Sequence, residues 1–171
     1  MNEHAGSVAL RVMRDSDVPE VVAIQEPASI VGLASVFPQD EFPFPRQDVA
    51  RQWREEIAEA GTDCFVVLEE RRVVGFAAIR GEELLHFGIA IERWGSGIAQ
   101  QAHDALIDAM RRRGGSRAWL RVFAGNARGR AFYERLGWRP TGDRTRSTFA
   151  PNPELLRYEL DLLSARTRVN R

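Results

Sequence analysis

The chain has 171 residues, of which 44% are hydrophobic and 28% are charged, as in ordinary globular domains. Its 24 basic and 24 acidic residues give a net charge of zero, which argues against nucleic acid as a partner, because nucleic-acid binding usually needs a broad basic face. No apolar run approaches the roughly 18 residues of a membrane span, and no signal segment opens the chain, so we expect a cytoplasmic protein without a membrane partner.

Hydrophobic periodicity predicts a single domain at residues 8–163 between flexible tails at residues 1–7 and 164–171. We expect helices that begin at Ser16 or Asp17, at Arg46, near Ala99 and after Asn126, and strands at residues 8–13, 64–68, 73–79, 84–91, 118–123, 138–143 and 155–162. The second to fourth strands form an antiparallel meander, and the third helix crosses over to a fifth strand parallel to the fourth. The predicted fold class is therefore α/β, with an α+β mixed sheet of about seven mostly antiparallel strands, a central parallel pair and four helices.

Two segments are predicted to be irregular. Residues 27–45 contain four prolines, which exclude a regular helix and predict a structured loop. Residues 144–153 are expected to form a polar loop between the last two strands. Cys64 is the only cysteine and is expected in a buried strand, and the three histidines are scattered without metal-ligand spacing, so we expect neither a disulfide nor a metal site.

A glycine-rich turn joins the fourth strand to the third helix. Gly95 and Gly97 allow the backbone to approach a ligand closely, and the first free amides of the helix point in one direction with the positive end of the helix dipole behind them. The sequence therefore predicts a phosphate site, alongside the simpler reading of a tight connection. The residues of this turn are Trp94, Gly95, Ser96, Gly97, Ile98 and Ala99.

A second motif lies downstream, where Asn126 is a good N-cap and Gly137 stands where a helix ends. Tyr133 follows Asn126 by about two helical turns, so both side chains project to the same side. Together, the two stretches resemble the GNAT superfamily of acyl-CoA-dependent N-acetyltransferases, with patterns Q/R-x-x-G-x-G/A and N-x-x-A-x-x-x-Y-x-x-x-G-F. Two positions depart from these patterns: Trp94 replaces Gln or Arg, and Gly129 replaces Ala.

The resemblance implies acetyl-CoA as the cofactor. Its pantetheine arm would lie beside Phe87, Gly88 and Ile89, where Gly88 would ease a bulge and an amide such as that of Ile89 would hold the thioester carbonyl. The diphosphate would lie on the glycine turn and near Asn126. Because Trp94 brings no charge, we expect Arg93, Arg128 or Arg130 to supply it, although each could equally be a solvated surface arginine.

Acetyl transfer to an amine needs a proton for the departing thiolate and a base for the ammonium group. Tyr133 is the predicted acid, and Glu83 is the predicted base, with Glu82 and His86 as rivals. The resemblance also implies that the first two helices and their connection form the acceptor side. Carboxylates attract a cation and aromatic faces hold it. The candidate acceptor residues there are Phe37, Asp40, Glu41, Phe42 and Phe44.

We therefore expect transfer of an acetyl group to a primary amine of a small molecule, by direct attack in a ternary complex. The bulky Phe-Pro segment favours an enclosed site over a groove for peptides. Two alternatives stay open at this point: an acetyltransferase acting on a peptide or protein, and a non-catalytic CoA-binding regulatory module. A homodimer is common in the family, and nothing in the sequence decides it.

Overall fold

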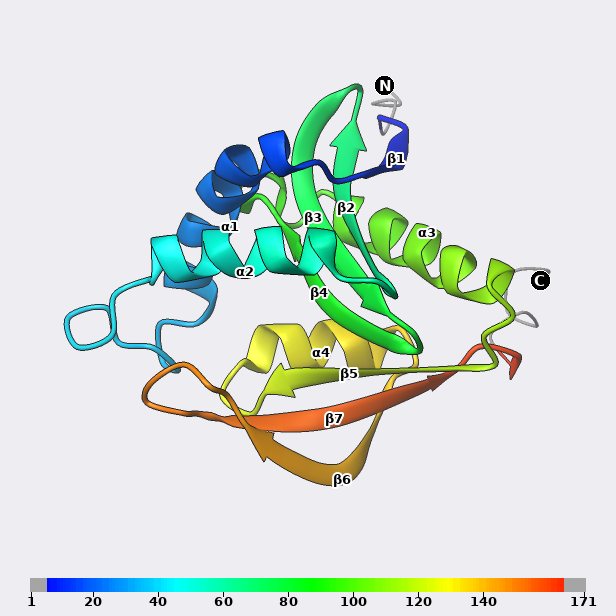
Figure 1. Ribbon diagram of the computed structural model, residues 1–171. Coiled ribbons are helices and arrows are strands. Elements are labelled where there is room, and N and C mark those ends of the chain that lie inside the picture. The colour runs from blue at the N-terminus through cyan, green and yellow to red at the C-terminus, as the bar shows by residue number, and fades with distance from the viewer. Residues whose placement is uncertain (1–5, 165–171) are drawn as a thin grey trace.

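One twisted seven-stranded sheet forms the centre of the computed structural model, which describes residues 6–164 (Figure 1). The strand order is β1-β2-β3-β4-β5-β7-β6, and every neighbouring pair is antiparallel except β4 and β5. The predicted mixed sheet, including its meander and its central parallel pair, is confirmed. The strands are β1 (Val8–Val12), β2 (Thr62–Glu69), β3 (Arg72–Arg80), β4 (Glu83–Ile89), β5 (Arg117–Phe123), β6 (Arg139–Arg146) and β7 (Glu154–Asp161).

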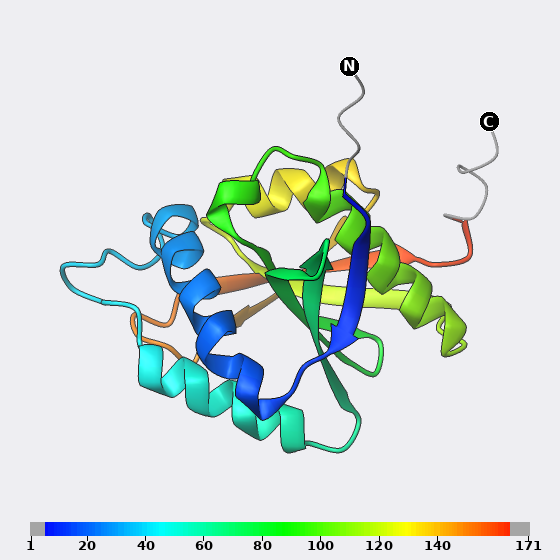
Figure 2. The same cartoon turned by 90° about the horizontal axis from the view of Figure 1, so that it is seen from above.

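The four α-helices of the described residues cover the two faces of the sheet in pairs (Figure 2). They are α1 (Val18–Gly32), α2 (Arg46–Ala58), α3 (Ile98–Arg112) and α4 (Ala127–Arg135). The first two pack over β2 and β3 through a cluster that includes Val21, Trp53 and Phe76. On the opposite face, Leu106 and Trp138 are fully buried against the middle of the sheet. Within residues 6–164, no helix is long and apolar enough to cross a membrane.

The parallel strands β4 and β5 separate soon after they meet. Glu83 opposite Trp119 is their one paired position, and the strands diverge toward Ile89 and Phe123. The Ala90 N–H donates to the Val74 carbonyl on β3, at 2.7 Å. Backbone N–H and C=O groups alternate in direction along a strand. Because Ala90 faces β3, the backbone groups of Ile89 and Phe87 face the gap beside β5. These N–H and C=O groups of β4 are not paired with β5 and can take part in hydrogen bonds with a ligand.

A bulge in β4 changes which side chains face each layer. Ile79 pairs with Leu84 and Ala78 pairs with His86, so Leu85 is the extra residue. Leu84 packs into the core under α3, whereas Leu85 packs into the core under α1 and α2. The bulge therefore turns two consecutive side chains, Leu85 and His86, toward α2.

The prediction that residues 27–45 form a loop is wrong in its first part, because α1 continues through Pro27 to Gly32. A proline removes a single helical N–H, and contacts just before it hold the helix in place. Gln25 accepts a hydrogen bond from the Trp53 indole at 2.8 Å, and Glu26 accepts one from Arg46 at 2.9 Å. Tertiary contacts with α2 thus outweigh the cost of the proline.

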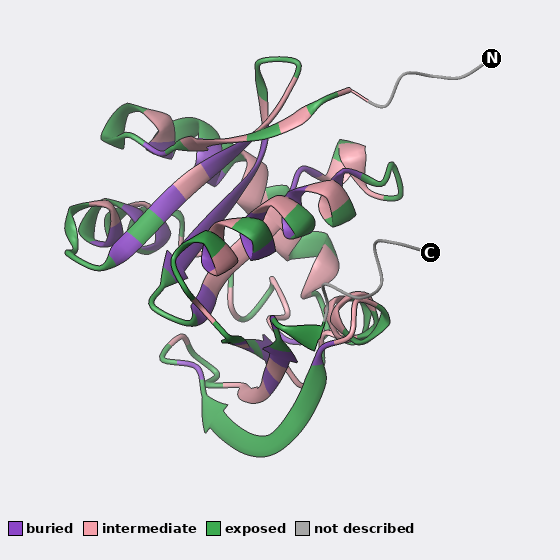
Figure 3. Cartoon of the chain, turned by 90° about the vertical axis from the view of Figure 1, so that its right-hand side faces the viewer, coloured by how far each residue is buried: buried purple, intermediate pink, exposed green. Residues whose placement is uncertain are grey.

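Strand β6 also extends beyond its prediction, to Arg146, so residues 144–146 belong to a strand and not to the polar loop. Every residue of β6 is exposed, and the edge strand carries no hydrophobic alternation that would reveal its length (Figure 3). Gly142, with φ of +91°, lies within a bulge between Pro140 and Arg144. The other strands and helices agree with their predictions to within two or three residues at each end, apart from the late end of α1.

Candidate active site

The glycine turn before α3 has the geometry of an anion site. Gly95 and Gly97 have φ values of +74° and +88°, which non-glycine residues rarely adopt, and the space where their side chains would lie is open. The N–H groups of Gly97, Ala99 and Gln100 find no hydrogen-bond partner among the described residues. The first turn of α3 has no acidic residue, so nothing on the helix competes with an incoming phosphate. These features fit a diphosphate.

Trp94 ties this turn to the elements around it. Its indole N–H donates to the Ile89 carbonyl at 3.0 Å, which is one of the backbone groups that face the gap. The guanidinium carbon of Arg128 lies 3.5 Å from the centre of the Trp94 ring, and Gly32 at the end of α1 lies beside the other edge of the ring. Trp94 therefore donates a hydrogen bond to β4. Through its contact with Arg128, it also holds a positively charged group beside the glycine turn.

The three arginines considered for the phosphates have different surroundings. Of these three, only Arg128 lines the cavity between α1, β4 and α4. Arg93 donates to the Glu69 carboxylate at 2.5 Å, and Arg130 donates to the Tyr158 hydroxyl and to the Ala124 carbonyl, both at 3.2 Å. The hydrogen bond to Tyr158 raises the pKa of Arg130. Arg93 and Arg130 thus already have protein partners outside this cavity.

Helix α4 begins with an N-cap, as its sequence predicts. The Asn126 side chain accepts a hydrogen bond from the Gly129 N–H at 2.9 Å. A Cβ on Gly129 would lie only 2.5 Å from the Asn126 amide nitrogen. Glycine replaces the family's alanine here because the capping amide folds tightly over the first turn of the helix.

A cavity of about 230 Å³ connects these features. Its walls come from the end of α1, from β4, from the glycine turn and from the start of α4. The structure brings together eight of the predicted cofactor and catalytic residues along this cavity, five from the two sequence motifs and three from β4: Trp94, Ala99, Asn126, Arg128 and Tyr133, with Phe87, Gly88 and Ile89. We call this cavity the cofactor cleft.

Tyr133 packs edge-on against Phe132 and Trp138 in the cofactor cleft. Its hydroxyl finds no hydrogen-bond partner among residues 6–164. Burial raises the pKa of Tyr133 above its ordinary value of 10. The side chain therefore holds its proton at neutral pH while it lines the cavity.

The expectation that Gly88 eases a bulge is wrong. The ladder between β3 and β4 is regular there, with Phe76 opposite Gly88, and the bulge lies earlier, at Leu85. A Cβ on Gly88 would lie 2.4 Å from the Phe76 ring. Glycine is needed at this position because the Phe76 ring covers it.

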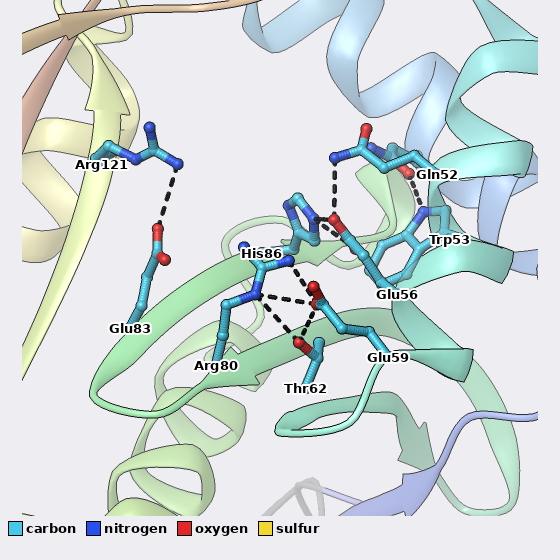
Figure 4. Close-up of polar contacts among 10 residues, drawn as sticks. Gln52, Trp53, Glu56, Glu59, Thr62, Arg80, Glu83, His86 and Arg121 are labelled. Atoms are coloured by element: carbon cyan, nitrogen blue, oxygen red, sulfur yellow. Dashed lines mark hydrogen bonds and ion pairs between the residues drawn. The ribbon is translucent and has the colours of Figure 1, made fainter.

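A different cluster lies on β4 beside α2 and β5 (Figure 4). Glu83 is buried, and its carboxylate lies 3.4 Å from the guanidinium of Arg121 on β5. His86 Nε2 lies 3.0 and 2.8 Å from the two carboxylate oxygens of Glu56 on α2, which also accepts a hydrogen bond from Gln52. We did not single out Glu56, Arg121 or Gln52 from the sequence, since none of them belongs to a motif.

Glu56 also borders a second cavity, of about 400 Å³, which we call the acidic cavity. It lies between α2, the end of β3 and the loop before β7. Four carboxylates and two guanidinium groups line it, together with a glutamine and an aromatic ring: Asp48, Arg51, Gln52, Glu55, Glu56, Glu59, Arg80 and Phe149. Arg51 pairs with Asp48 and Arg80 pairs with Glu59, so the wall keeps an excess of negative charge.

The acceptor residues selected from the Phe-Pro segment do not line either cavity. The segment projects from the body of the molecule between α1 and α2 (Figure 1). Asp40 and Glu41 are exposed, and Phe42 is half-buried. Phe37 packs edge-on against Phe123 at the end of β5, with ring centres 5.3 Å apart, and Phe44 packs against the core under α1 and α2.

Two other kinds of chemistry find no support in the described part of the chain. No group of three or more potential metal ligands occurs there. Cys64 is buried in β2, as expected, and burial raises the pKa of its thiol to about 12, so it carries no thiolate near neutral pH.

Comparisons with solved structures find the same fold in acetyltransferases. A spermidine N-acetyltransferase from Vibrio cholerae, solved in complex with CoA and spermine, is 17% identical with a TM-score of 0.69, over 92% of this chain and 97% of that one. An acetyltransferase from Salmonella typhimurium that modifies the N-terminal serine of ribosomal protein L7/L12 is 15% identical with a TM-score of 0.69, over 91% and 95%. A ribosomal-protein-alanine N-acetyltransferase from Brucella melitensis is 22% identical with a TM-score of 0.66, over 90% and 99%.

A search among curated proteins gives no significant match. The family model described as acetyltransferase (GNAT) family matches residues 28–138, which is more than half of the chain. That span runs from within α1 to Trp138 and includes the glycine turn, Asn126 and Tyr133. The chain belongs to the GNAT acetyltransferase family.

Proposed function

We propose that this enzyme transfers an acetyl group from acetyl-CoA to a primary amine of a small, positively charged molecule, by direct attack in a ternary complex. One observation carries the proposal: β4 lines the cofactor cleft at Phe87, Gly88 and Ile89, and the residue before them, His86, contacts Glu56 in the wall of the acidic cavity. A donor and an acceptor can then approach the same stretch of β4.

On the donor side, the free amides before α3 bind the diphosphate, and Arg128 adds positive charge. The open backbone edge of β4, at Phe87 and Ile89, binds the pantetheine arm, and an Ile89 amide holds the thioester carbonyl. Acetyl-CoA supplies an activated acyl carbon when bound. Tyr133 would then donate its proton to the sulfur as the carbon–sulfur bond breaks, because a phenol is still protonated at neutral pH and the departing thiolate needs a proton.

On the acceptor side, the acidic cavity favours a cationic molecule over a neutral one. Glu55 makes no ion pair within the described residues, so one carboxylate of the wall is left for a ligand. Glu83 remains a predicted base from the sequence. Its carboxylate lies 3.4 Å from the Arg121 guanidinium, and this ion pair favours a role in orienting the amine.

Release of free thiol from acetyl-CoA, measured against a panel of acceptors, tests the proposal. The panel includes diamines and polyamines, neutral monoamines, and peptides with free N-termini, with a control that contains no acceptor. We expect the highest kcat/KM with a small amine that carries a second positive charge.

The other outcomes separate the alternatives. The highest kcat/KM with peptides would identify a peptide or protein acetyltransferase. No thiol release with any amine, combined with heat of CoA binding in calorimetry, would instead identify a non-catalytic CoA-binding module.

A further inference from the structure

We infer that His86, oriented by Glu56, is the base that removes a proton from the acceptor ammonium group, a step that rests on the proposed acetyl transfer. Figure 4 shows the His86 ring between Glu56 on α2 and the Glu83–Arg121 pair. Glu56 lines the acidic cavity, whereas Phe87 and Gly88, which follow His86, line the cofactor cleft. The imidazole therefore lies on the stretch of β4 that separates the two cavities.

The hydrogen bonds of His86 determine which of its nitrogens can act as the base. A carboxylate can only accept hydrogen bonds, so Nε2 carries the proton that it donates to Glu56 at 2.8 Å. In the neutral ring, Nδ1 then holds the free electron pair. No hydrogen bond to Nδ1 occurs in the described residues, and this atom is not closed off from solvent. The pair thus presents an open proton acceptor.

Packing holds this arrangement in place. The His86 ring contacts the Trp53 ring edge-on, with centres 5.0 Å apart, and Trp53 is itself anchored to Gln25 by a hydrogen bond. Glu56 is buried and also accepts a hydrogen bond from Gln52. A carboxylate fixed in this way keeps the imidazole in one tautomer and stabilises the imidazolium that forms when it takes a proton.

The β4 bulge is what directs His86 to this position. Without the extra residue Leu85, strict alternation would place His86 on the same face as Leu84, under α3 and away from the acidic cavity. The bulge is therefore a structural cause of the proposed role and not only a local irregularity.

Charged and titratable groups surround the imidazole on several elements. Glu56 lies on α2, Glu59 directly after it, Cys64 on β2, Arg80 on β3, Glu83 on β4 and Arg121 on β5. Glu59 is paired with Arg80 and Glu83 with Arg121, and the Cys64 thiol is protonated near neutral pH. Glu56 is thus the carboxylate that acts directly on His86.

The proton balance of the step is complete. The ammonium group gives its first proton to His86 Nδ1, and the amine nitrogen uses the freed electron pair to form a bond to the acyl carbon. The carbon–sulfur bond breaks, and the sulfur takes a proton from Tyr133. The second proton that the nitrogen loses replaces the one given by Tyr133, and the proton on His86 passes to solvent.

The test compares His86→Gln and Glu56→Gln with Glu20→Gln, an exposed glutamate on α1 that lines neither cavity. Steady-state rates are measured from pH 5.5 to 9 with an alkyl amine, which arrives charged, and with an alkoxyamine, which is already neutral. For His86→Gln we expect kcat with the alkyl amine to fall about 100-fold and the acidic limb of the pH–rate profile to disappear. The rate with the alkoxyamine and the KM for acetyl-CoA should change less than threefold.

Glu56→Gln should lower kcat with the alkyl amine more than with the alkoxyamine, because the imidazole loses the carboxylate that orients it. Glu20→Gln should leave both the rates and the acidic limb as they are in the wild type. Equal losses of rate with both amines in His86→Gln, or an intact acidic limb, would overturn the role of His86 while leaving acetyl transfer in place. No turnover of any amine by the wild-type enzyme would overturn the proposed function and this inference with it. Circular dichroism and melting temperatures confirm that each variant is folded.

Discussion

At the residue scale, Tyr133 has the protonation state that a general acid requires. It lies in the cofactor cleft, its hydroxyl has no partner within the described residues, and burial raises the pKa of Tyr133. A phenol with a raised pKa stays protonated through the neutral range, so its proton is available whenever a thiolate forms beside it. A tyrosine that served only to fill the core would not need a free hydroxyl.

Removing the Tyr133 hydroxyl separates its proposed role as an acid from its role in packing. We expect Tyr133→Phe to lower kcat about 100-fold, since the thiolate then departs without a proton, and to leave the KM for acetyl-CoA within about twofold. Phenylalanine keeps the edge-on contacts with Phe132 and Trp138, so the melting temperature should stay close to that of the wild type. Stopped-flow and steady-state thiol release measure the effect, and an unchanged kcat would remove Tyr133 from the mechanism.

At the element scale, Trp94 joins four elements that meet at the cofactor cleft. Its ring and indole N–H contact β4, the end of α1 and, through Arg128, the start of α4, while its backbone belongs to the turn before α3. A contact of this kind sets how far the two sides of the cleft lie apart. It also fixes a guanidinium group at the rim, where the family pattern has a polar side chain on the turn itself.

Arg128 and Arg93 therefore form a matched pair for measuring phosphate binding. We expect Arg128→Gln to raise the Kd for CoA about tenfold, or about 1.4 kcal/mol, because a charged contact to the phosphates is lost. Arg93→Gln should change that Kd less than twofold, since its guanidinium is already paired with Glu69. Calorimetry with pantetheine, which lacks the phosphates, is the second control. A loss of pantetheine affinity equal to the loss of CoA affinity would show that Arg128 acts by packing on Trp94 and not by charge.

The elements also show what a sequence can reveal about this enzyme. The glycine turn, the Asn126 cap and Tyr133 are local signals, because each depends on residues within one or two helical turns, and the structure brings them to one cleft. The length of α1 was missed because its contacts with α2, through Gln25 and Trp53, outweigh a proline. The pair of His86 with Glu56 was missed because it joins residues 30 positions apart, through a bulge that has no sequence signature.

At the scale of the whole molecule, residues on both faces of the sheet take part in the proposed chemistry. Helices α1 and α2 cover one face, and α3 and α4 cover the other (Figure 2). The glycine turn and Tyr133 belong to α3 and α4, the acidic cavity and His86 lie beside α2, and the cofactor cleft is lined by α1 as well as by α4. The divergence of β4 and β5 is what connects these faces. Both strands must therefore be held firmly by the core behind them, and the largest buried side chains lie in that core.

His103 makes the stability of this core depend on pH. It is 3% exposed on α3, its Nε2 accepts a hydrogen bond from the Trp138 indole at 2.9 Å, and its Nδ1 faces Asp104 at 3.1 Å. Burial lowers the pKa of His103 below its ordinary value of 6.5, and Asp104 opposes this shift only in part. The unfolded chain then binds a proton near pH 6.5 that the folded protein does not bind. The stability that the neutral ring contributes is therefore complete above pH 6.5 and is lost as the pH falls below it.

Urea unfolding at pH 7 and pH 5 tests this dependence in the wild type and in His103→Gln, whose amide oxygen can still accept from Trp138 and does not titrate. Binding of one proton to the unfolded chain lowers the free energy of unfolding by at most about 1.4 kcal/mol per pH unit below 6.5. We expect the free energy of unfolding of the wild type to fall by about 1 to 2 kcal/mol more than that of the variant. The difference between wild type and variant cancels the contribution of the other titrating groups. If the free energy of unfolding fell equally in both proteins, His103 would accept a proton in the folded protein as readily as in the unfolded chain.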